Sequence, residues 1–291
     1  MTLLHLVELG SARLESAGVS FGHGTTNAFD EAAWLVLWRL GLPLDALHEQ
    51  ASRPVQAAER QAVDALLQAR IETRQPAAYL TGEAWLQGVP FDIDPRAIVP
   101  RSLIAEVLAE GVLDAWLGGA PATVLDLCTG NGSLAVLAAL AWPAAQVDAC
   151  DLSAPALEVA QRNVRRHDLA ARVRLLQGDG LAAAPVCYDL VLCNPPYVNR
   201  RSMADLPDEY RAEPAMALDG GEDGMDFVRV LLRQLADPAD GHLAPGGVLV
   251  LEIGHERAHF EAAFPMLEPV WLPTSAGDDQ VLLLTREALG R

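Results

Sequence analysis

The chain of 291 residues is 51% hydrophobic, which predicts a folded protein with a large buried core and excludes wholesale disorder. Its 39 acidic and 21 basic residues give a formal net charge of −18, and such a surface repels the phosphate backbone of duplex DNA or free RNA. No apolar run reaches the roughly 18 residues that a membrane span requires, so we expect neither a membrane nor duplex DNA as a direct partner.

Residues 1–80 are predicted to be helical. Apolar residues recur there at helical spacing, as in "DEAAWLVLWRLGL" and "AAERQAVDALLQARIETR". The segment 81–102 differs, because glycines and prolines punctuate short apolar runs, and this pattern predicts a β-hairpin or linker. In the remainder, 103–291, strand-like and helix-like stretches alternate. We therefore expect an N-terminal helical domain, a hairpin or linker, and a larger second domain.

Within the larger domain, continuous apolar runs predict strands that are buried on both faces. Repeated strand–helix units of this kind form a mostly parallel sheet covered by helices on both sides. The last two runs are close enough in the chain to pair as an antiparallel hairpin. The fold class is α/β, and the predicted strands cover residues 123–128, 146–151, 172–179, 188–193, 246–254, 268–273 and 279–287.

The N-terminus and the cysteines indicate a reducing, cytoplasmic setting. The first residues carry Glu8 and Glu15 at helical spacing and no basic leader, so we expect an amphipathic helix there rather than a signal peptide. The cysteine spacing fits neither a zinc site nor a secreted disulfide framework, and we expect no bound metal. The four cysteines, most of them in or beside apolar strand-like runs, are Cys128, Cys150, Cys187 and Cys193.

A glycine loop follows the first predicted strand of the larger domain. In "DLCTGNGSLA", Gly130 and Gly132 let the backbone turn tightly and approach a ligand closely. Asp151, at the end of the second strand, is placed to accept hydrogen bonds from a ribose diol. Taken alone, the loop also fits a nicotinamide dinucleotide fingerprint loosely, through Gly130, Gly132 and Ala135, or a simple strand-to-helix turn.

Two further features favour S-adenosylmethionine as the cofactor. Asp126 lies four residues before Gly130, where a carboxylate attracts the amino and sulfonium groups of the methyl donor but faces a pyrophosphate unfavourably. Asp179 and Gly180 follow the third strand, at a position that can contact the adenine edge. The predicted cofactor-binding residues are Asp126, Cys128, Thr129, Gly130, Asn131, Gly132, Asp151, Leu152, Asp179, Gly180 and Asn194.

The catalytic candidates follow the fourth strand of the larger domain and are Asn194, Pro195, Pro196 and Tyr197. Prolines have no backbone N–H and a fixed φ, so the carbonyl groups of this segment are held rigidly. Asn194 adds a side-chain carbonyl, and Tyr197 adds a ring that can stack on a planar group. Acceptors beside a platform suit an –NH2 group on a planar system, so the pattern predicts an amino-group methyltransferase.

Asn194-Pro195-Pro196-Tyr197 together with "DLCTGNGSLA" resembles the HemK-type protein glutamine N5-methyltransferases, over nearly the whole chain. The resemblance implies a Rossmann-like class I S-adenosylmethionine-dependent methyltransferase sheet, with 1–80 as a substrate-recognition domain. Adenine-N6 DNA methyltransferases share the wider motif, but they usually add a DNA-recognition region, and no such basic segment is visible here. Gly180 departs from the family, which often carries a bulky residue at that position.

The family has two main branches, which act on peptide-chain release factors or on ribosomal protein L3. Three stretches resemble the L3 branch: "FGHGTTNAFDEA" (21–32), "VPRSLI" (99–104) and the long insert 203–227, which directly follows the catalytic motif. The release-factor branch typically has Pro-Asp-Thr-Glu after Pro-Arg, whereas Ser-Leu-Ile follows Arg101 here. The resemblance therefore implies ribosomal protein L3, a basic protein, as the partner.

Three hypotheses follow. The main one is N5-methylation of a glutamine side-chain amide on L3. A second keeps the chemistry but changes the target to a release factor or to an amino group of a nucleic acid. A third is a catalytically silent binding module, such as an assembly factor that holds a ribosomal protein. Asn194 and the unbroken glycine loop argue against the third, because a silent relative needs neither.

Overall fold

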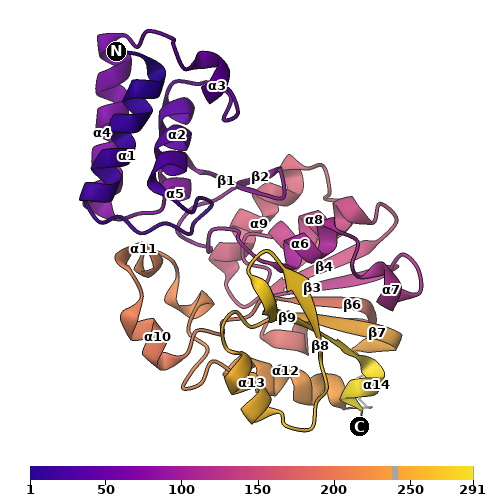
Figure 1. The fold of residues 1–291 in the computed structure, drawn as a ribbon. Coiled ribbons are helices and arrows are strands. Elements are labelled where there is room, and N and C mark those ends of the chain that lie inside the picture. Colours follow the sequence, from indigo (N-terminus) through magenta and orange to yellow (C-terminus); the bar gives the residue numbers. More distant parts are fainter. Residues whose placement is uncertain (238–241, 291) are drawn as a thin grey trace.

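The computed structural model describes residues 1–237 and 242–290, so the last residue of the predicted 103–291 domain lies outside the described part. The N-terminal part is helical, and it forms a bundle at one end of the molecule (Figure 1). Side chains of Thr2 and Asn27 cap the first two helices by accepting from backbone N–H groups. The helices are α1 (Leu3–Ser16), α2 (Ala28–Arg39), α3 (Leu47–Gln50), α4 (Ala57–Thr73) and α5 (Ala77–Thr81).

A two-stranded antiparallel hairpin, β1 (Glu83–Leu86) and β2 (Val89–Asp92), follows the helices. Gly88 lies in the turn between the two strands, and its φ of +74° is a left-handed conformation that favours glycine. The hydrophobic core of the helical part continues into this region and onto α9 (Ala154–Arg166), through Ile93, Val99 and Val159. The helical bundle and the sheet region are thus joined by shared apolar packing.

The central sheet has seven strands in the order β5-β4-β3-β6-β7-β9-β8. The first five in this order are parallel, β9 is antiparallel to β7, and β8 pairs antiparallel with β9. This confirms the predicted parallel sheet and its terminal hairpin. The strands are β3 (Thr123–Leu127), β4 (Gln146–Asp151), β5 (Val173–Gln177), β6 (Tyr188–Cys193), β7 (Leu243–Glu252), β8 (Val270–Thr274) and β9 (Gly277–Thr285).

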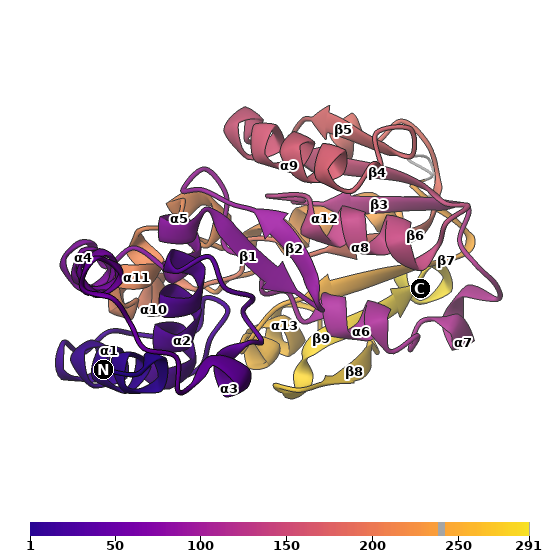
Figure 2. The same ribbon diagram turned by 90° about the horizontal axis from the view of Figure 1, so that it is seen from above.

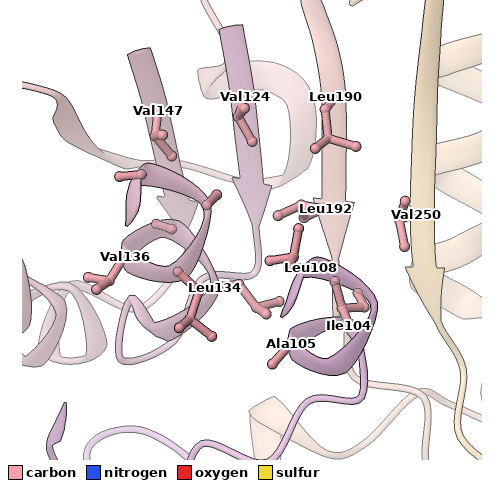
Figure 3. Packing of buried hydrophobic residues seen from close by; sticks show 14 of the residues in the cluster. Ile104, Ala105, Leu108, Val124, Leu134, Val136, Val147, Leu190, Leu192 and Val250 are labelled. Atoms are coloured by element: carbon pink, nitrogen blue, oxygen red, sulfur yellow. The ribbon is translucent and has the colours of Figure 1, made fainter. Parts of the chain in front are cut away.

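Alternate residues of each central strand point to opposite faces, and both faces are buried. On one face, α8 (Ser133–Ala141) and α6 (Ile104–Ala109) pack on the strands (Figure 3). The other face is covered by α12 (Asp226–Ala236), α13 (Arg257–Ala263) and α14 (Arg286–Leu289). The labelled residues of the first face are Ile104, Ala105, Leu108, Val124, Leu134, Val136, Val147, Leu190, Leu192 and Val250.

Strand order places the predicted site at one edge of the sheet. The strand order reverses at β3: the chain adds β4 and β5 on one side of β3 and then β6 and β7 on the other, with all five strands parallel. The loop after β3, the end of β4 and the motif after β6 therefore emerge side by side, at the switch point where open α/β sheets bind ligands. Two glycines, Asp151 and Asn194 are brought together in this way although they lie far apart in the sequence.

The insert 203–227 is folded. It contains the end of α10 (Arg200–Asp205), α11 (Asp208–Arg211) and the short 3-10 helix η2 (Ala215–Ala217). Figures 1 and 2 both show α11 beside the N-terminal helices, and Figure 1 shows α10 farther from them, beyond α11. α7 (Asp114–Leu117) and the 3-10 helix η1 (Gly180–Ala183) complete the elements. Within the described residues, no helix has both the length and the apolar character needed to cross a membrane.

Candidate active site

A cavity lies at the carboxyl ends of β3, β4 and β6. The loops that follow these strands and β5 form one side of it. The predicted site residues that line the cavity are Cys128, Gly130, Asp151, Leu152, Asp179, Gly180, Asn194 and Pro196. Residues from all four predicted motifs thus share one cavity.

Asp151 connects the glycine loop to the end of β4. Its Oδ2 accepts from the backbone N–H of Gly130 at 2.8 Å, and its Oδ1 accepts from the backbone N–H of Ser153 at 2.8 Å. Burial raises the pKa of the Asp151 carboxyl above its ordinary value, although these backbone N–H groups oppose the shift. A carboxylate offers about four acceptor sites, so Asp151 retains capacity for two hydroxyl donors.

Gly130 provides open space beside Asp151. Its φ is +55°, a left-handed conformation that favours glycine, and a Cβ built on it would meet nothing within 4 Å. Next to the same end of β4, the side chain of Leu152 is 55% exposed although it is apolar. A carboxylate with free acceptor sites, an open glycine and an exposed apolar side chain fit a nucleoside, with its ribose on Asp151.

Asp126 does not line the cavity, which differs from the expectation that its charge attracts the donor. The residue is 1% exposed, and its Oδ2 accepts from Thr129 Oγ1 and from the backbone N–H of Ala135. Burial raises the pKa of Asp126 to about 7 and so disfavours the charged form. Through Oδ2 the carboxyl group braces the glycine loop against the start of α8, while its buried Oδ1 has no hydrogen-bond partner among the described residues, so a role of Asp126 in donor binding stays a prediction.

Three other loop residues also have structural contacts instead of a place on the cavity wall. The backbone N–H of Thr129 donates to the Cys150 carbonyl, and the Asn131 carbonyl accepts from the Asn163 side chain of α9. A Cβ on Gly132 would lie 3.0 Å from the Cβ of Ala160, so glycine allows α9 to approach the loop closely. These contacts shape the loop, and donor binding by these three residues stays a prediction.

Asn194 and Pro196 line the cavity, but Pro195 and Tyr197 do not. The Tyr197 hydroxyl donates to Glu252 Oε1 at 3.3 Å, and its ring lies against Gly254, where a Cβ would be 2.6 Å from Cε2. Glu252 also accepts from the hydroxyl of Ser102 at 2.5 Å. The structure does not place the ring as a stacking platform in the cavity. Tyr197 anchors the motif to the end of β7.

Burial also affects the acidity of this anchor. Desolvation raises the pKa of Glu252 above its ordinary value, and desolvation and the nearby carboxylate raise that of Tyr197 well above the ordinary tyrosine value. The phenol is therefore neutral at physiological pH, which suits a hydrogen-bond donor. The Cys128 thiol is neutral as well, because contact with Cys193 and burial raise its pKa. The site provides oriented polar groups and no thiolate nucleophile.

The backbone conformation explains why position 180 carries a glycine and not a bulky residue. The φ of Gly180 is +55°, so a bulky side chain at this position would be strained. Phe227 of α12 also lines the cavity and supplies an aromatic side chain. A planar base in the cavity can therefore have an apolar neighbour although residue 180 is a glycine.

Sequence reasoning missed one part of the second wall of the cavity, the part that the linker forms. The lining residues of this wall come from the segment before α6 and from the insert, and they are Arg96, Ala97, Ile98, Pro214, Met216, Ala217 and Phe227. The position of the insert directly after the catalytic motif was the signal for its part of this wall. No local pattern marks Ala97 or Ile98, because they reach the cavity only through the packing of the linker.

The fold and the cavity define a Rossmann-like class I methyltransferase that uses S-adenosylmethionine. Family models agree: the methyltransferase small domain matches residues 105–212, and the PrmC N-terminal domain matches residues 5–82. A methyltransferase from Pyrococcus furiosus has a similar fold, with a TM-score of 0.51 at 21% identity over 75% of this chain and 97% of that one. The hMettl16 catalytic domain gives a TM-score of 0.53 at 13% identity, over 79% of this chain and 81% of that one.

Named relatives that match nearly the whole chain identify the family within this class of methyltransferases. The ribosomal protein uL3 glutamine methyltransferase of Bordetella pertussis is 56% identical, over 99% of this chain and 96% of the relative. The proteins of the same name from Burkholderia pseudomallei and Neisseria meningitidis serogroup B are 50% and 45% identical, over 97% and 99% of this chain and 94% of each relative. The chain belongs to the family of ribosomal protein uL3 glutamine methyltransferases.

Proposed function

We propose that this protein methylates the side-chain amide nitrogen of a glutamine in ribosomal protein uL3, with S-adenosylmethionine as the methyl donor. The observation that carries the proposal is that Asn194 lines the same cavity as Gly130 and Asp151. A group that can hold an amide thus lies in the cavity that fits the nucleoside of the donor. The relatives named as uL3 glutamine methyltransferases support the choice of substrate.

The amide nitrogen is a poor nucleophile because its lone pair is delocalised into the carbonyl group. Asn194 lines the cavity, and its side-chain oxygen accepts one N–H group of the amide. The Pro195 carbonyl is the proposed acceptor for the second, because Pro195 stands between two lining residues although it does not line the cavity itself, and the two hydrogen bonds favour a more pyramidal nitrogen. The lone pair then faces the cofactor side of the cavity. When bound, S-adenosylmethionine supplies a methyl group on a positively charged sulfur. Catalysis by Asn194 and Pro195 therefore rests on positioning and oriented dipoles.

Substrate recognition is assigned to residues 1–80, with 81–102 as a linker and 103–291 as the methyltransferase domain. Packing of the insert on the N-terminal helices supports this assignment, because Arg70 of α4 binds Glu209 of the insert, and other residues of the insert line the cavity. The net charge of −18 favours a basic partner through long-range attraction. A ribosomal protein substrate and the thiols of Cys128, Cys150 and Cys193 fit action in the cytoplasm.

Methyl transfer to four candidate substrates tests the proposal. Purified protein and donor labelled in the methyl group are incubated with free uL3, intact large ribosomal subunits, a release factor and duplex DNA. Free uL3 is expected to be labelled fastest, and mass spectrometry should place the methyl group on a glutamine. Labelling mainly of the release factor or of DNA would overturn the choice of substrate.

The variant Asn194→Ala tests the site in the same assay. Turnover should fall about 10²-fold or more, as expected for the loss of one preorganised polar contact. Donor affinity, measured by calorimetry, should change little because Asp151 and Gly130 remain in place. Turnover close to that of the unchanged protein would show that Asn194 does not hold the amide.

A further inference from the structure

Two carboxylates of the insert are buried against other parts of the chain. The side chains of Glu209 and Glu213 are 2% and 0% exposed. Glu209 binds the N-terminal helices: it accepts from Arg70 at 3.3 Å, from Arg74 at 3.4 Å and from the backbone N–H of Ser20 at 3.2 Å. Buried carboxylates require such partners, so both are specific attachment points of the insert.

Glu213 binds the linker instead. Arg101 donates from both terminal guanidinium nitrogens to the two carboxylate oxygens of Glu213, each at 2.7 Å, and the backbone N–H of Val99 donates to Oε1 at 2.9 Å. His23 Nε2 lies 3.4 Å from Oε2, and the His23 ring contacts the ring of Tyr210 with centroids 4.3 Å apart. A bidentate arginine pair fixes both distance and orientation.

These contacts join three stretches of the sequence at one carboxylate. His23 belongs to 21–32, Val99 and Arg101 belong to 99–104, and Glu213 belongs to 203–227. They are the three stretches that resemble the L3 branch. Donor binding does not explain the roles of His23, Arg101 and Glu213, because none of these residues lines the cavity.

The residues next to this junction do line the cavity. Ala97 and Ile98 directly precede Val99, while Pro214, Met216 and Ala217 directly follow Glu213. We call Ile98, Pro214, Met216 and Ala217 the acceptor wall, because they lie on the part of the cavity that the donor-binding loops do not form.

The acceptor wall is also held at its other end. The backbone N–H of Val198 donates to the Leu218 carbonyl at 2.8 Å, and that of Gly220 donates to the Val198 carbonyl at 2.9 Å. Val198 directly follows the catalytic motif. The short segment 214–217 is therefore clamped between Glu213 and the continuation of the Asn194 motif, and its position relative to Asn194 depends on both ends.

We propose that Glu213 is a positioning residue that sets the acceptor wall for the incoming glutamine. The inference rests on the proposed function. Glu213 acts through Pro214–Ala217 on one side and, through the backbone of Val99, on Ile98 on the other, so one carboxylate places both parts of the acceptor wall. Glu209 attaches the insert with comparable burial and charge, but it binds helices that do not line the cavity.

The pair Glu213→Gln and Glu209→Gln tests the proposal. Each change removes one buried charge and keeps the side-chain shape. Glu213→Gln is expected to raise the KM for free uL3 about 10-fold or more. The reason is that a displacement of about 1 Å in the groups that position a substrate can weaken its productive binding by a large factor. The Kd for S-adenosylmethionine should stay within about 2-fold in both variants, since the donor-binding loops do not contact either residue. Glu209→Gln should lower the melting temperature and raise the KM less than Glu213→Gln does, because Glu209 holds the insert on the N-terminal helices and not on a segment that lines the cavity.

Hydrogen exchange gives a readout that does not depend on activity. The amides of Ala217, Leu218 and Gly220 donate within or beside the clamped segment. Their exchange should accelerate about 10-fold in Glu213→Gln and little in Glu209→Gln, because only the first releases one end of the segment. Equal effects of the two variants on KM and exchange would reduce Glu213 to a structural attachment and overturn the proposal.

Two further results keep the test decisive. If Glu213→Gln fails to fold, Arg101→Lys retains the charge but loses the bidentate geometry, and it should raise the KM without affecting donor binding. An unchanged KM in Arg101→Lys with the same exchange rates would contradict the inference. The failure of the proposed function looks different, because the unchanged protein would then not label uL3 at all.

Discussion

Gly224 lies where the insert touches the catalytic motif. A Cβ at Gly224 would lie 2.2 Å from the backbone oxygen of Tyr197 and 3.2 Å from its carbonyl carbon. Carbon–oxygen contacts of this kind normally lie at about 3.3 Å or more. The substitution Gly224→Ala therefore forces the Tyr197 carbonyl and the insert apart by about 1 Å. Asn194, three residues before Tyr197 on the same rigid segment, should move with it.

The expected magnitude has two parts. The φ of Gly224 is +79°, and placing a side chain in this left-handed region costs about 1–2 kcal/mol of stability. Displacement of a positioning group by about 1 Å lowers turnover about 10²-fold. Donor affinity should change little, because Gly130 and Asp151 belong to other strands.

Gly246→Ala is a matched control. Gly246 has a φ of +75°, a Cβ there would meet nothing within 4 Å, and the residue lies in the first half of β7, at the end of the sheet opposite the site. Both variants carry the same type of backbone strain, but only Gly224→Ala collides with the motif. Turnover on free uL3, the Kd for the donor and the melting temperature are measured for both. Equal turnover in the two variants would refute the idea that contact between the insert and the motif positions Asn194.

Three other outcomes are expected. Asp151→Ala should weaken donor binding in calorimetry about 10-fold or more, because it removes charged acceptors from the ribose. Neither the unchanged protein nor the variant should bind NAD. Measurable NAD affinity without donor affinity would contradict the cofactor assignment. Burial alone would raise the pKa of the Glu213 carboxyl, but Arg101 and His23 outweigh it and lower the pKa from 4.5 to about 2. A contribution of about 3 kcal/mol should therefore be present above pH 4.5 and be lost as the pH falls toward 2. Denaturant unfolding across this range should show the difference between the unchanged protein and Glu213→Gln narrowing at low pH, and a constant difference would argue against the ion pair. Methylation of free uL3 should slow as ionic strength rises to about 0.15 M, because surface charges are screened, and a salt-independent rate would remove the charge argument.

The sequence by itself determined the α/β class, the succession of helices and strands along the chain, and the motifs at the ends of the strands. Strands buried on both faces need continuous apolar runs, so β3 and β6 were visible directly, and their boundaries match to within one residue. The glycine loop and the Asn194 motif were identifiable because special backbone geometry requires glycine and proline at definite positions.

Tertiary structure alone decided where several of these side chains act. Asp126 and Tyr197 carry polar groups that suit a ligand, yet Asp126 turns into its own loop and Tyr197 turns toward Glu252. Sequence patterns report on neighbours within a helix or strand, whereas these contacts depend on how elements pack. The clearest case is the insert, whose Glu213 finds Arg101 across 112 residues of chain. A buried carboxylate must find a cation, but only the folded chain determines which one it finds.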